Sequence, residues 1–547
     1  MSASNKKKLR KEQEAEKLTE KQLSAQKEAK KTDRITYSFI TLMAVILVAA
    51  IVLGVNQVVR NSGVLERKTV ALTVGEHEIS NAELGYFYMD AVNTFTSQYG
   101  NYAAMFGLDL SMPLDQQVQN PETGETWADS FLTSARENAK DTYALVDAAN
   151  EEGFALTEDQ LAEIDTTILN LEAYAKIYGY SDANRYIKAI YGSGATVDSY
   201  KAYVTHNTMA SAYYDAHSES LTYTDEDIRA KEAEDPKAYS SYSYNTYYLS
   251  ASNFLEGGTE DENGNKTYSD EEKQASVDAA KAAADSILEG KPTTVAELDA
   301  CIAALPEREN QSTASQAYAD TLYSSVSSVY ADWVTDEARK EGDVTVIANT
   351  STTTNEDGTE ETVTNGYYVV FYTGMSDNQF SLKNVRHILV PFQGGTQDAA
   401  TGATTYSDEE KAAAKTSAED ILKEFESGDK TEDSFAALAK EKSTDPGSKD
   451  NGGLYENVYP GQMVTAFNDW CFDETRAAGD TGIVETEYGY HVMYFVGDAD
   501  ITYRDYLITN DLRTAEMEKW YTDLVDAMPM DLGNDRYIRK DLVVSAS

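Results

Sequence analysis

Three segments of this chain occur twice, in the same order along the sequence. The segment TYSDEEKQASVDAAKAAADSILEG, from Thr267, returns as TYSDEEKAAAKTSAEDILKEFESG, from Thr405. VYADWVTDEARKEGDVTVI returns as AFNDWCFDETRAAGDTGIV, and NGYYVVFYTG returns as YGYHVMYFVG. A shared preference for helix explains the first match but not the other two. The sequence therefore predicts two tandem copies of one structural unit, at residues 236–380 and 381–500.

The second copy has a histidine near each end. His387 lies in VRHILV and His491 in YGYHVMYF, and both segments are typical of short β-strands because they are rich in Val, Ile and Tyr. Between them come an amphipathic helix, a Gly-rich turn that begins at Asp445, and an apolar pair, Met463 and Phe467. These parts predict one pocket built from imidazole, carboxylate and apolar side chains.

The order of these parts resembles the parvulin-type family of peptidyl-prolyl cis/trans isomerase domains, through RHILV, FAALAKEKSTDPGSKDNGG, GQMVTAF and AAGDTGIVETEYGYHVM. The resemblance implies an α+β fold in which helices surround an antiparallel sheet. It implies a catalytic set made of His387, Asp445 and His491. It also implies substrate-binding residues, which are Leu454, Met463, Phe467 and Thr486. In this family the histidines share hydrogen bonds with hydroxyl groups, for which Thr486 and Ser443 are candidates.

A single strand histidine is more often a packed residue than a catalytic one, but the whole set in family order favours catalysis. Rotation about an X–Pro bond faces a barrier of roughly 18–20 kcal/mol, because the twisted amide loses its resonance. A catalyst needs only to bind the twisted amide better than the planar forms, without a nucleophile, metal or cofactor. We therefore expect no cofactor and no metal site, and we interpret Cys471 as a packing residue.

The loop after the first strand of this copy, PFQGGTQDAATGATTYSDEE, contains no Lys or Arg. Parvulins that act on phosphorylated substrates place a basic cluster there. The acidic residues of this loop would instead repel a phosphoserine before proline. We expect the substrate to be unphosphorylated, unfolded polypeptide.

The first copy keeps the apolar pattern and loses the polar site. Its sequence aligns Tyr247 with His387, Ala314 with Asp445 and Tyr368 with His491, and it has no counterpart of the DPGSKDNGG turn. We interpret this copy as a degenerate, non-catalytic binding or spacer module.

Residues 35–55 form an uncharged run of 21 residues. As a helix the run would be about 31 Å long, enough to span a hydrocarbon core of roughly 30 Å. Residues 1–34 carry 11 Lys/Arg and 6 Asp/Glu, so the positive-inside rule predicts a cytoplasmic tail and extracytoplasmic domains after Asn56. A cleaved signal peptide is the alternative, but the run is long for one. PrsA-type members of the family in Gram-positive bacteria usually attach through a lipidated cysteine, and no cysteine occurs near this run.

The chain has a formal net charge of −47. Such a surface would repel nucleic acid, and no Asp-x-Asp-x-Asp-Gly loop predicts a specific calcium site. The two cysteines, Cys301 and Cys471, fall in different copies, so disulfides do not organise the fold.

Residues 56–235 have mostly helical patterning, with helix starts at Ser80 and Thr157. This region, including the segment YTDEDIRAKEAEDP near its end, resembles the helical chaperone domain of PrsA- and SurA-type foldases. Three histidines in this region, which are His77, His206 and His217, are predicted to be surface or packing residues without partners. In residues 501–547, apolar side chains recur at helical spacing, and the resemblance implies that this last helix completes the helical domain.

Two functions are consistent with these patterns. The first is a membrane-anchored, extracytoplasmic prolyl isomerase that assists the folding of exported proteins in a Gram-positive type of envelope. The second is a holdase whose parvulin folds bind peptides without catalysis.

Overall fold

The computed structural model describes residues 3–13, 43, 45–48, 50, 58–59, 61–260, 265–308, 311–354, 359–398 and 401–543. Most of the predicted membrane span, residues 35–55, lies outside this set. No helix within the described ranges is long and apolar enough to cross a membrane. The anchor therefore stays a prediction.

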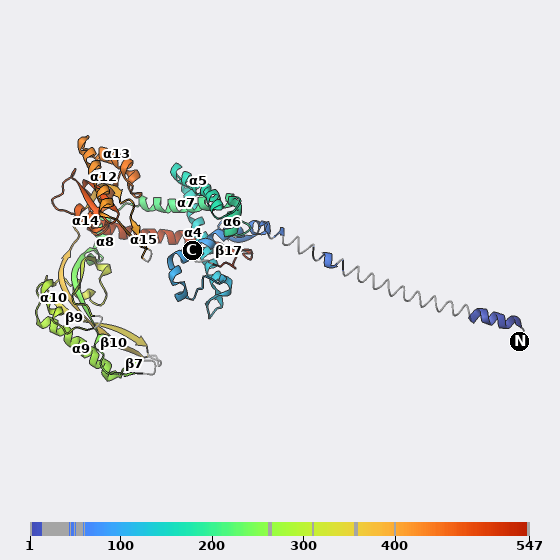
Figure 1. The fold of residues 1–547 in the computed structure, drawn as a ribbon, viewed down its shortest axis with the longest axis horizontal. Helices are drawn as coiled ribbons and strands as arrows, with labels where there is room; N and C mark the ends of the chain where they lie inside the picture. Colours follow the sequence, from blue (N-terminus) through green and yellow to red (C-terminus); the bar gives the residue numbers. More distant parts are fainter. Residues whose placement is uncertain are drawn as a thin grey trace. The chain divides into compact units, whose positions relative to one another are not determined.

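The chain divides into two compact units (Figure 1). Unit 1 is Met1–Leu221 together with Glu516–Ser547, and unit 2 is Thr222–Ala515.

Unit 1 consists of helices around a small antiparallel sheet of order β17-β1-β2. Its helices are α2 (Val64–Lys68), α3 (Asn81–Tyr99), α4 (Trp127–Glu152), α5 (Glu158–Ile177), α6 (Ala183–Tyr191) and α7 (Val197–Ser220). Its strands are β1 (Val70–Val74), β2 (His77–Ser80), β3 (Val118–Asn120), β4 (Glu125–Thr126) and β17 (Met530–Leu532). The hydroxyl groups of Ser80 and Thr157 cap α3 and α5, where the sequence places the helix starts.

The end of the chain returns to unit 1. Helix α15 (Tyr503–Ala527) contributes Trp520 and Leu524 to an apolar cluster with Val146 of α4 and Ala210 of α7. Strand β17 then pairs with β1, with Leu532 opposite Leu72. The first and last strands of the described chain therefore share one sheet.

The histidines of unit 1 do have partners, contrary to the sequence-based expectation. His77 Nε2 lies 2.7 Å from Asp147 Oδ1, and the ring of His217 stacks on Trp520 at 3.9 Å between centroids. His206 Nδ1 lies 3.1 Å from the hydroxyl of Tyr143, which also donates to Glu83. Because these partners come from other helices, no local sequence pattern reveals them.

Unit 2 contains two four-stranded antiparallel sheets, of order β8-β5-β10-β9 and β14-β11-β16-β15. The first sheet consists of β5 (Ser241–Ser250), β8 (Gln316–Leu322), β9 (Val344–Thr354) and β10 (Glu360–Ser376). The second consists of β11 (Ser381–Pro391), β14 (Leu454–Val458), β15 (Thr481–Thr486) and β16 (Gly489–Thr502). Both sheets therefore have the same connectivity.

The helices that cover the two sheets also correspond. One face of the first sheet packs against α9 (Asp270–Glu289) and α10 (Val295–Ala303), and the other packs against α11 (Ala331–Val334). The second sheet packs in the same way against α12 (Asp408–Ser427), α13 (Glu432–Lys442) and α14 (Thr465–Cys471). Unit 2 also contains α8 (Asp225–Glu232) and two small hairpins, β6 (Thr259–Glu260) with β7 (Lys266–Thr267), and β12 (Thr396–Gln397) with β13 (Thr404–Thr405).

The sheet register corrects one position of the repeat alignment. Val370 of the first sheet corresponds to Met493 of the second, and their partners are Thr246 and His387. Thr246, and not Tyr247, therefore occupies the position of His387. Tyr247 points to the other face of the sheet and packs beneath α9 and α10, because successive side chains of a strand alternate between faces.

Candidate active site

The two histidines of the second sheet lie on its two central strands. His387 of β11 is directly opposite Met493 of β16, and His491 is opposite Leu389. Their exposed fractions are only 3% and 5%. The site is thus built on a stretch of the two central strands, from Val385 to Pro391 and from Gly489 to Phe495, that pairs without a register shift.

Gly453 allows the edge strand to approach His387. The backbone N–H of His387 donates to Gly453 O at 2.8 Å. Gly453 has φ +75°, and a Cβ atom at this position would lie 2.2 Å from His387 O. Only glycine satisfies both the left-handed backbone and the close contact.

The polar side chains form one chain of hydrogen bonds. Thr486 Oγ1 lies 2.8 Å from His491 Nε2, and His491 Nδ1 lies 2.9 Å from His387 Nδ1. His387 Nε2 lies 2.8 Å from Asp445 Oδ2. With both rings neutral, one arrangement of protons satisfies every contact: the Thr486 hydroxyl donates to His491, His491 donates to His387, and His387 donates to the carboxylate.

Two further hydroxyl groups hold the carboxylate. Tyr455 donates to Asp445 Oδ2 at 3.0 Å, and Ser448 donates to the same oxygen. Ser448 Oγ also lies 3.1 Å from His387 Nε2. Sequence reasoning missed both residues, although Ser448 lies in the Gly-rich turn itself, three positions after Asp445.

Hydrogen bonding and burial set the charge of two members of the network, Asp445 and His491. The hydrogen bond from His387 holds the pKa of Asp445 well below its usual range, and Ser448 and Tyr455 act in the same direction. Burial lowers the pKa of His491 to about 4, and the neighbouring His387 adds to this effect. At neutral pH the site therefore contains an ionised Asp445 beside a neutral His491.

Apolar side chains pack against the two imidazole rings. The ring of Phe467 lies 5.4 Å from the ring of His387 and 5.4 Å from that of His491, nearly perpendicular to both. Met463 is half-buried in the same cluster as Phe467. The structure thus brings a hydrogen-bonded floor and an apolar wall together in one place.

Two of the expected site residues lie elsewhere. Leu454 is opposite Arg386 in the register, so it lies on the face away from His387, and Tyr455 takes the place beside the network. Ser443 accepts from the backbone N–H groups of Leu389 and Asp445, both at 3.2 Å, rather than contacting either histidine. Ser443 positions the turn that carries the carboxylate.

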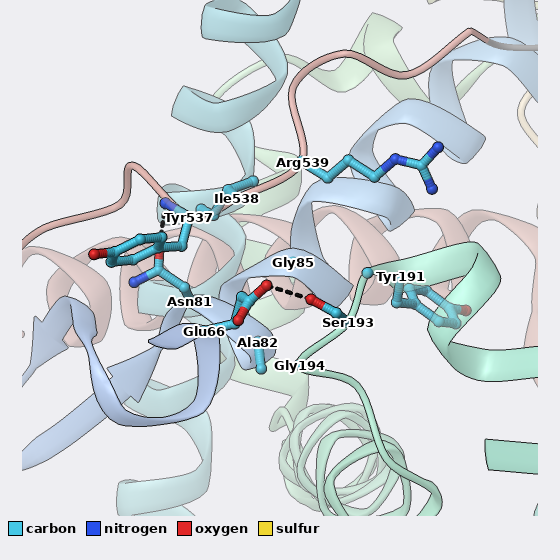
Figure 2. A pocket seen from close by; sticks show the side chains of 11 residues that line it. Glu66, Asn81, Ala82, Gly85, Tyr191, Ser193, Gly194, Tyr537, Ile538 and Arg539 are labelled. Carbon is cyan, nitrogen blue, oxygen red and sulfur yellow. Dashed lines mark hydrogen bonds between the residues drawn. The ribbon is translucent and has the colours of Figure 1, made fainter. Parts of the chain in front are cut away.

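A separate cavity of about 150 Å³ lies in unit 1 (Figure 2). The hydroxyl of Ser193 donates to one carboxylate oxygen of Glu66 at its edge, and the other oxygen has no protein partner. Tyr191 and Arg539 also line it. This cavity contains none of the residues of the histidine network. The described residues include no cluster of His, Cys, Asp and Glu that could hold a metal ion.

Comparison with known proteins agrees with the geometry of the second sheet. Residues 368–498 match the family described as the PPIC-type PPIASE domain. The chain is 40% identical over 75 residues to foldase protein PrsA 2 of Listeria monocytogenes, which is 14% of this chain and 26% of that protein. It is 34% identical over 117 residues to foldase protein PrsA of Caldanaerobacter subterraneus, which is 20% of this chain and 36% of that protein.

Among solved structures, a peptidylprolyl isomerase (PrsA) from Bacillus anthracis matches with 20% identity and a TM-score of 0.17, over 28% of this chain and 59% of that one. The chain spans about a quarter of the length of the first curated relatives that it matches. Within this chain, the match to the PPIC-type, or parvulin-type, family of peptidyl-prolyl isomerase domains covers residues 368–498.

Proposed function

We propose that this protein is a membrane-anchored, extracytoplasmic peptidyl-prolyl cis/trans isomerase and chaperone that assists the folding of exported polypeptides. The observation that carries the proposal is the continuous hydrogen-bonded chain from Thr486 to Asp445 beside the ring of Phe467. In this arrangement a proline ring packs against Phe467 and Met463, and the amide carbonyl turns above the polar floor.

The charge of Asp445 gives this floor a catalytic role. A planar amide carries partial negative charge on its oxygen through resonance, and rotation removes that resonance. An ionised carboxylate that faces the carbonyl therefore disfavours the planar forms more than the twisted one, which lowers the barrier. His387 holds Asp445 in place, and the two imidazoles adjust their shared proton as the carbonyl moves.

The sequence of the loop that follows β11 favours unphosphorylated substrates. The sequence from Pro391 to Glu410 contains no cationic residue and includes Asp398, Asp408, Glu409 and Glu410. A phosphate group near these side chains would be repelled at short range.

The location of the protein rests on its N-terminal sequence. The basic tail of residues 1–34 and the uncharged run of residues 35–55 favour a single helix that crosses the membrane with its N-terminus in the cytoplasm. The acidic remainder of the chain, with few cysteines, suits a soluble region outside the membrane.

The first sheet is, on this proposal, a degenerate parvulin copy. It has the strand order of the second sheet, but Thr246 and Tyr368 replace the two histidines. A holdase without catalysis is the second candidate function. It is favoured by the apolar side chains that α5 exposes, among which Leu169 and Ile177 are each 71% exposed.

A proline-isomerisation assay on the full chain in mild detergent tests the catalytic proposal. We expect faster cis/trans exchange of an unphosphorylated X–Pro peptide, with no preference for phosphoserine before proline. His387→Ala should reduce the rate to that of buffer, whereas Thr246→Ala, at the matching position of the first sheet, should leave it unchanged. A wild-type rate equal to buffer, with the protein folded by circular dichroism, would end the enzyme proposal and leave the holdase.

A further inference from the structure

Five tyrosines form a continuous set of rings on the first sheet. We call this set the tyrosine face, and its members are Tyr244, Tyr248, Tyr318, Tyr330 and Tyr368. The centroid of Tyr244 lies 5.0 Å from that of Tyr318 and 5.6 Å from that of Tyr330. Tyr368 lies 5.3 Å from Tyr330 and 4.5 Å from Tyr248. These are the separations at which aromatic pairs attract each other.

The tyrosine face has the same place in the first sheet as the isomerase site in the second. Tyr330 matches Phe467 in the repeated YADW and FNDW segments, and Tyr368 matches His491. Tyr318 is opposite Tyr244 in the register, as Tyr455 is opposite Val385 in the second sheet. The aromatic wall is therefore extended: a tyrosine, Tyr368, occupies the position of His491, and Tyr244 and Tyr248 occupy positions where the second sheet has Val385 and Leu389.

The face has a buried base and an accessible rim. Tyr244 and Tyr330 are 1% and 5% exposed, whereas Tyr318 on the edge strand β8 is 38% exposed. Tyr248 and Tyr368 are half-buried, and the hydroxyl of Tyr248 donates to Asn365 O at 3.1 Å and accepts from Asn349 Nδ2 at 3.2 Å. The ring of Tyr248 is thus held in place before any ligand binds, which reduces the entropy lost on binding.

We propose that the tyrosine face binds an extended, proline-containing segment of an unfolded polypeptide and holds it without isomerising it. Proline-rich segments adopt the polyproline II conformation, which docks on aromatic surfaces with little loss of entropy because it is already formed. Tyrosine suits this ligand because its ring packs on the pyrrolidine while its hydroxyl reaches the backbone carbonyls. The inference rests on the proposed function, because it is the proline-binding role of the second sheet that identifies the ligand.

The absence of an imidazole–carboxylate pair separates binding from catalysis at this face. Thr246 stands where the second sheet has His387, and it is 5% exposed. No carboxylate corresponding to Asp445 lies among the five rings, all of which are within the described part of unit 2. A bound X–Pro bond would therefore contact the tyrosine rings but no ionised carboxylate that disfavours its planar forms.

Photo-crosslinking on the full chain in mild detergent tests this site directly. The probe is an Ala-Pro repeat peptide with a terminal benzophenone, and an Ala-Ser repeat peptide is the control without proline. Mass spectrometry of the digested protein should locate adducts on β8 and β10 as well as near Met463, and only with the proline peptide. Isomerisation by the same samples is measured separately, so that failure of the second-sheet activity is distinguishable from failure of this site.

Tyr318→Ala removes the exposed ring and should lower the adduct yield on the first sheet about fivefold, as expected when one aromatic contact is lost. Tyr318→Phe should retain the adducts, because the ring remains. Tyr102→Ala, which removes a tyrosine of unit 1 that is 60% exposed, is the matched control. Adducts confined to the second sheet, or equal labelling by the Ala-Ser peptide, would each overturn the proposal.

Discussion

His491 provides a quantitative test of how the site is built. Its pKa is lowered to about 4 in the folded chain, chiefly by burial, whereas an unfolded histidine titrates near ~6.5. Between these values the unfolded state binds more protons than the folded state, so stability falls as the pH drops from about 6.5 to about 4. A difference of ~2.5 pKa units corresponds to about 3 kcal/mol of unfolding free energy. Because His491 is only 5% exposed, solvent screens little of this effect.

Nuclear magnetic resonance measures the titration directly. The Cε1 proton of His491, assigned by its loss in His491→Gln, should shift with a midpoint near pH 4. Over the same range, hydrogen exchange of the β11 and β16 amides, corrected for intrinsic rates, should show local stability falling by about 3 kcal/mol. His491→Gln should remove most of that dependence. A midpoint near 6.5 together with constant protection would refute the assignment of a neutral, buried His491.

Three further changes probe the same region. Asp445→Asn removes the negative charge of the carboxylate that accepts the hydrogen bond from His387. It should lower the isomerisation rate at least about tenfold, which corresponds to a loss of ~1.4 kcal/mol of transition-state stabilisation. An unchanged rate would contradict the role of the carboxylate. Gly453→Ala should lower the unfolding free energy, measured in urea, by ~1–3 kcal/mol more than Gly461→Ala does. Both glycines have positive φ, but only at Gly453 would a Cβ atom meet a backbone oxygen. Equal effects would count against the close contact. Cys471 is buried, with its pKa raised to about 12, so a thiol reagent should modify it only after unfolding. Peptide mapping distinguishes it from the half-buried Cys301, and rapid modification of Cys471 in the native protein would show that α14 packs differently.

The sequence could predict that the polar residues of this site lie together, because each belongs to a local motif. His387, Asp445 and His491 each lie in a short, distinctive segment, and the folded chain brings them into one network with Thr486. What it could not predict was which face of the sheet a neighbouring residue occupies. A shift of one residue in a strand moves a side chain to the opposite face. Both errors of this kind, Tyr247 for Thr246 and Leu454 for Tyr455, are shifts of one residue.

Contacts between elements far apart in the sequence were also beyond the reach of sequence patterns. His77 and Asp147 are separated by 70 positions, and His206 meets Tyr143 across 63. Nothing in the periodicity of either segment indicates the other. The partners emerge only when α4 and α7 pack against the small sheet.

The pairing of β1 with β17 has a consequence for the order in which the protein folds. A ribosome releases Leu72 long before Leu532, so the three-stranded sheet cannot be completed until nearly the whole chain has been synthesised. All strands of the two sheets of unit 2 lie between β1 and β17 in the sequence, so these sheets can form while the chain is still being synthesised. Until then the apolar face of the early helices must be protected from aggregation. The protein thus passes, while it is being made, through the same vulnerable state as the unfolded chains that it is proposed to assist.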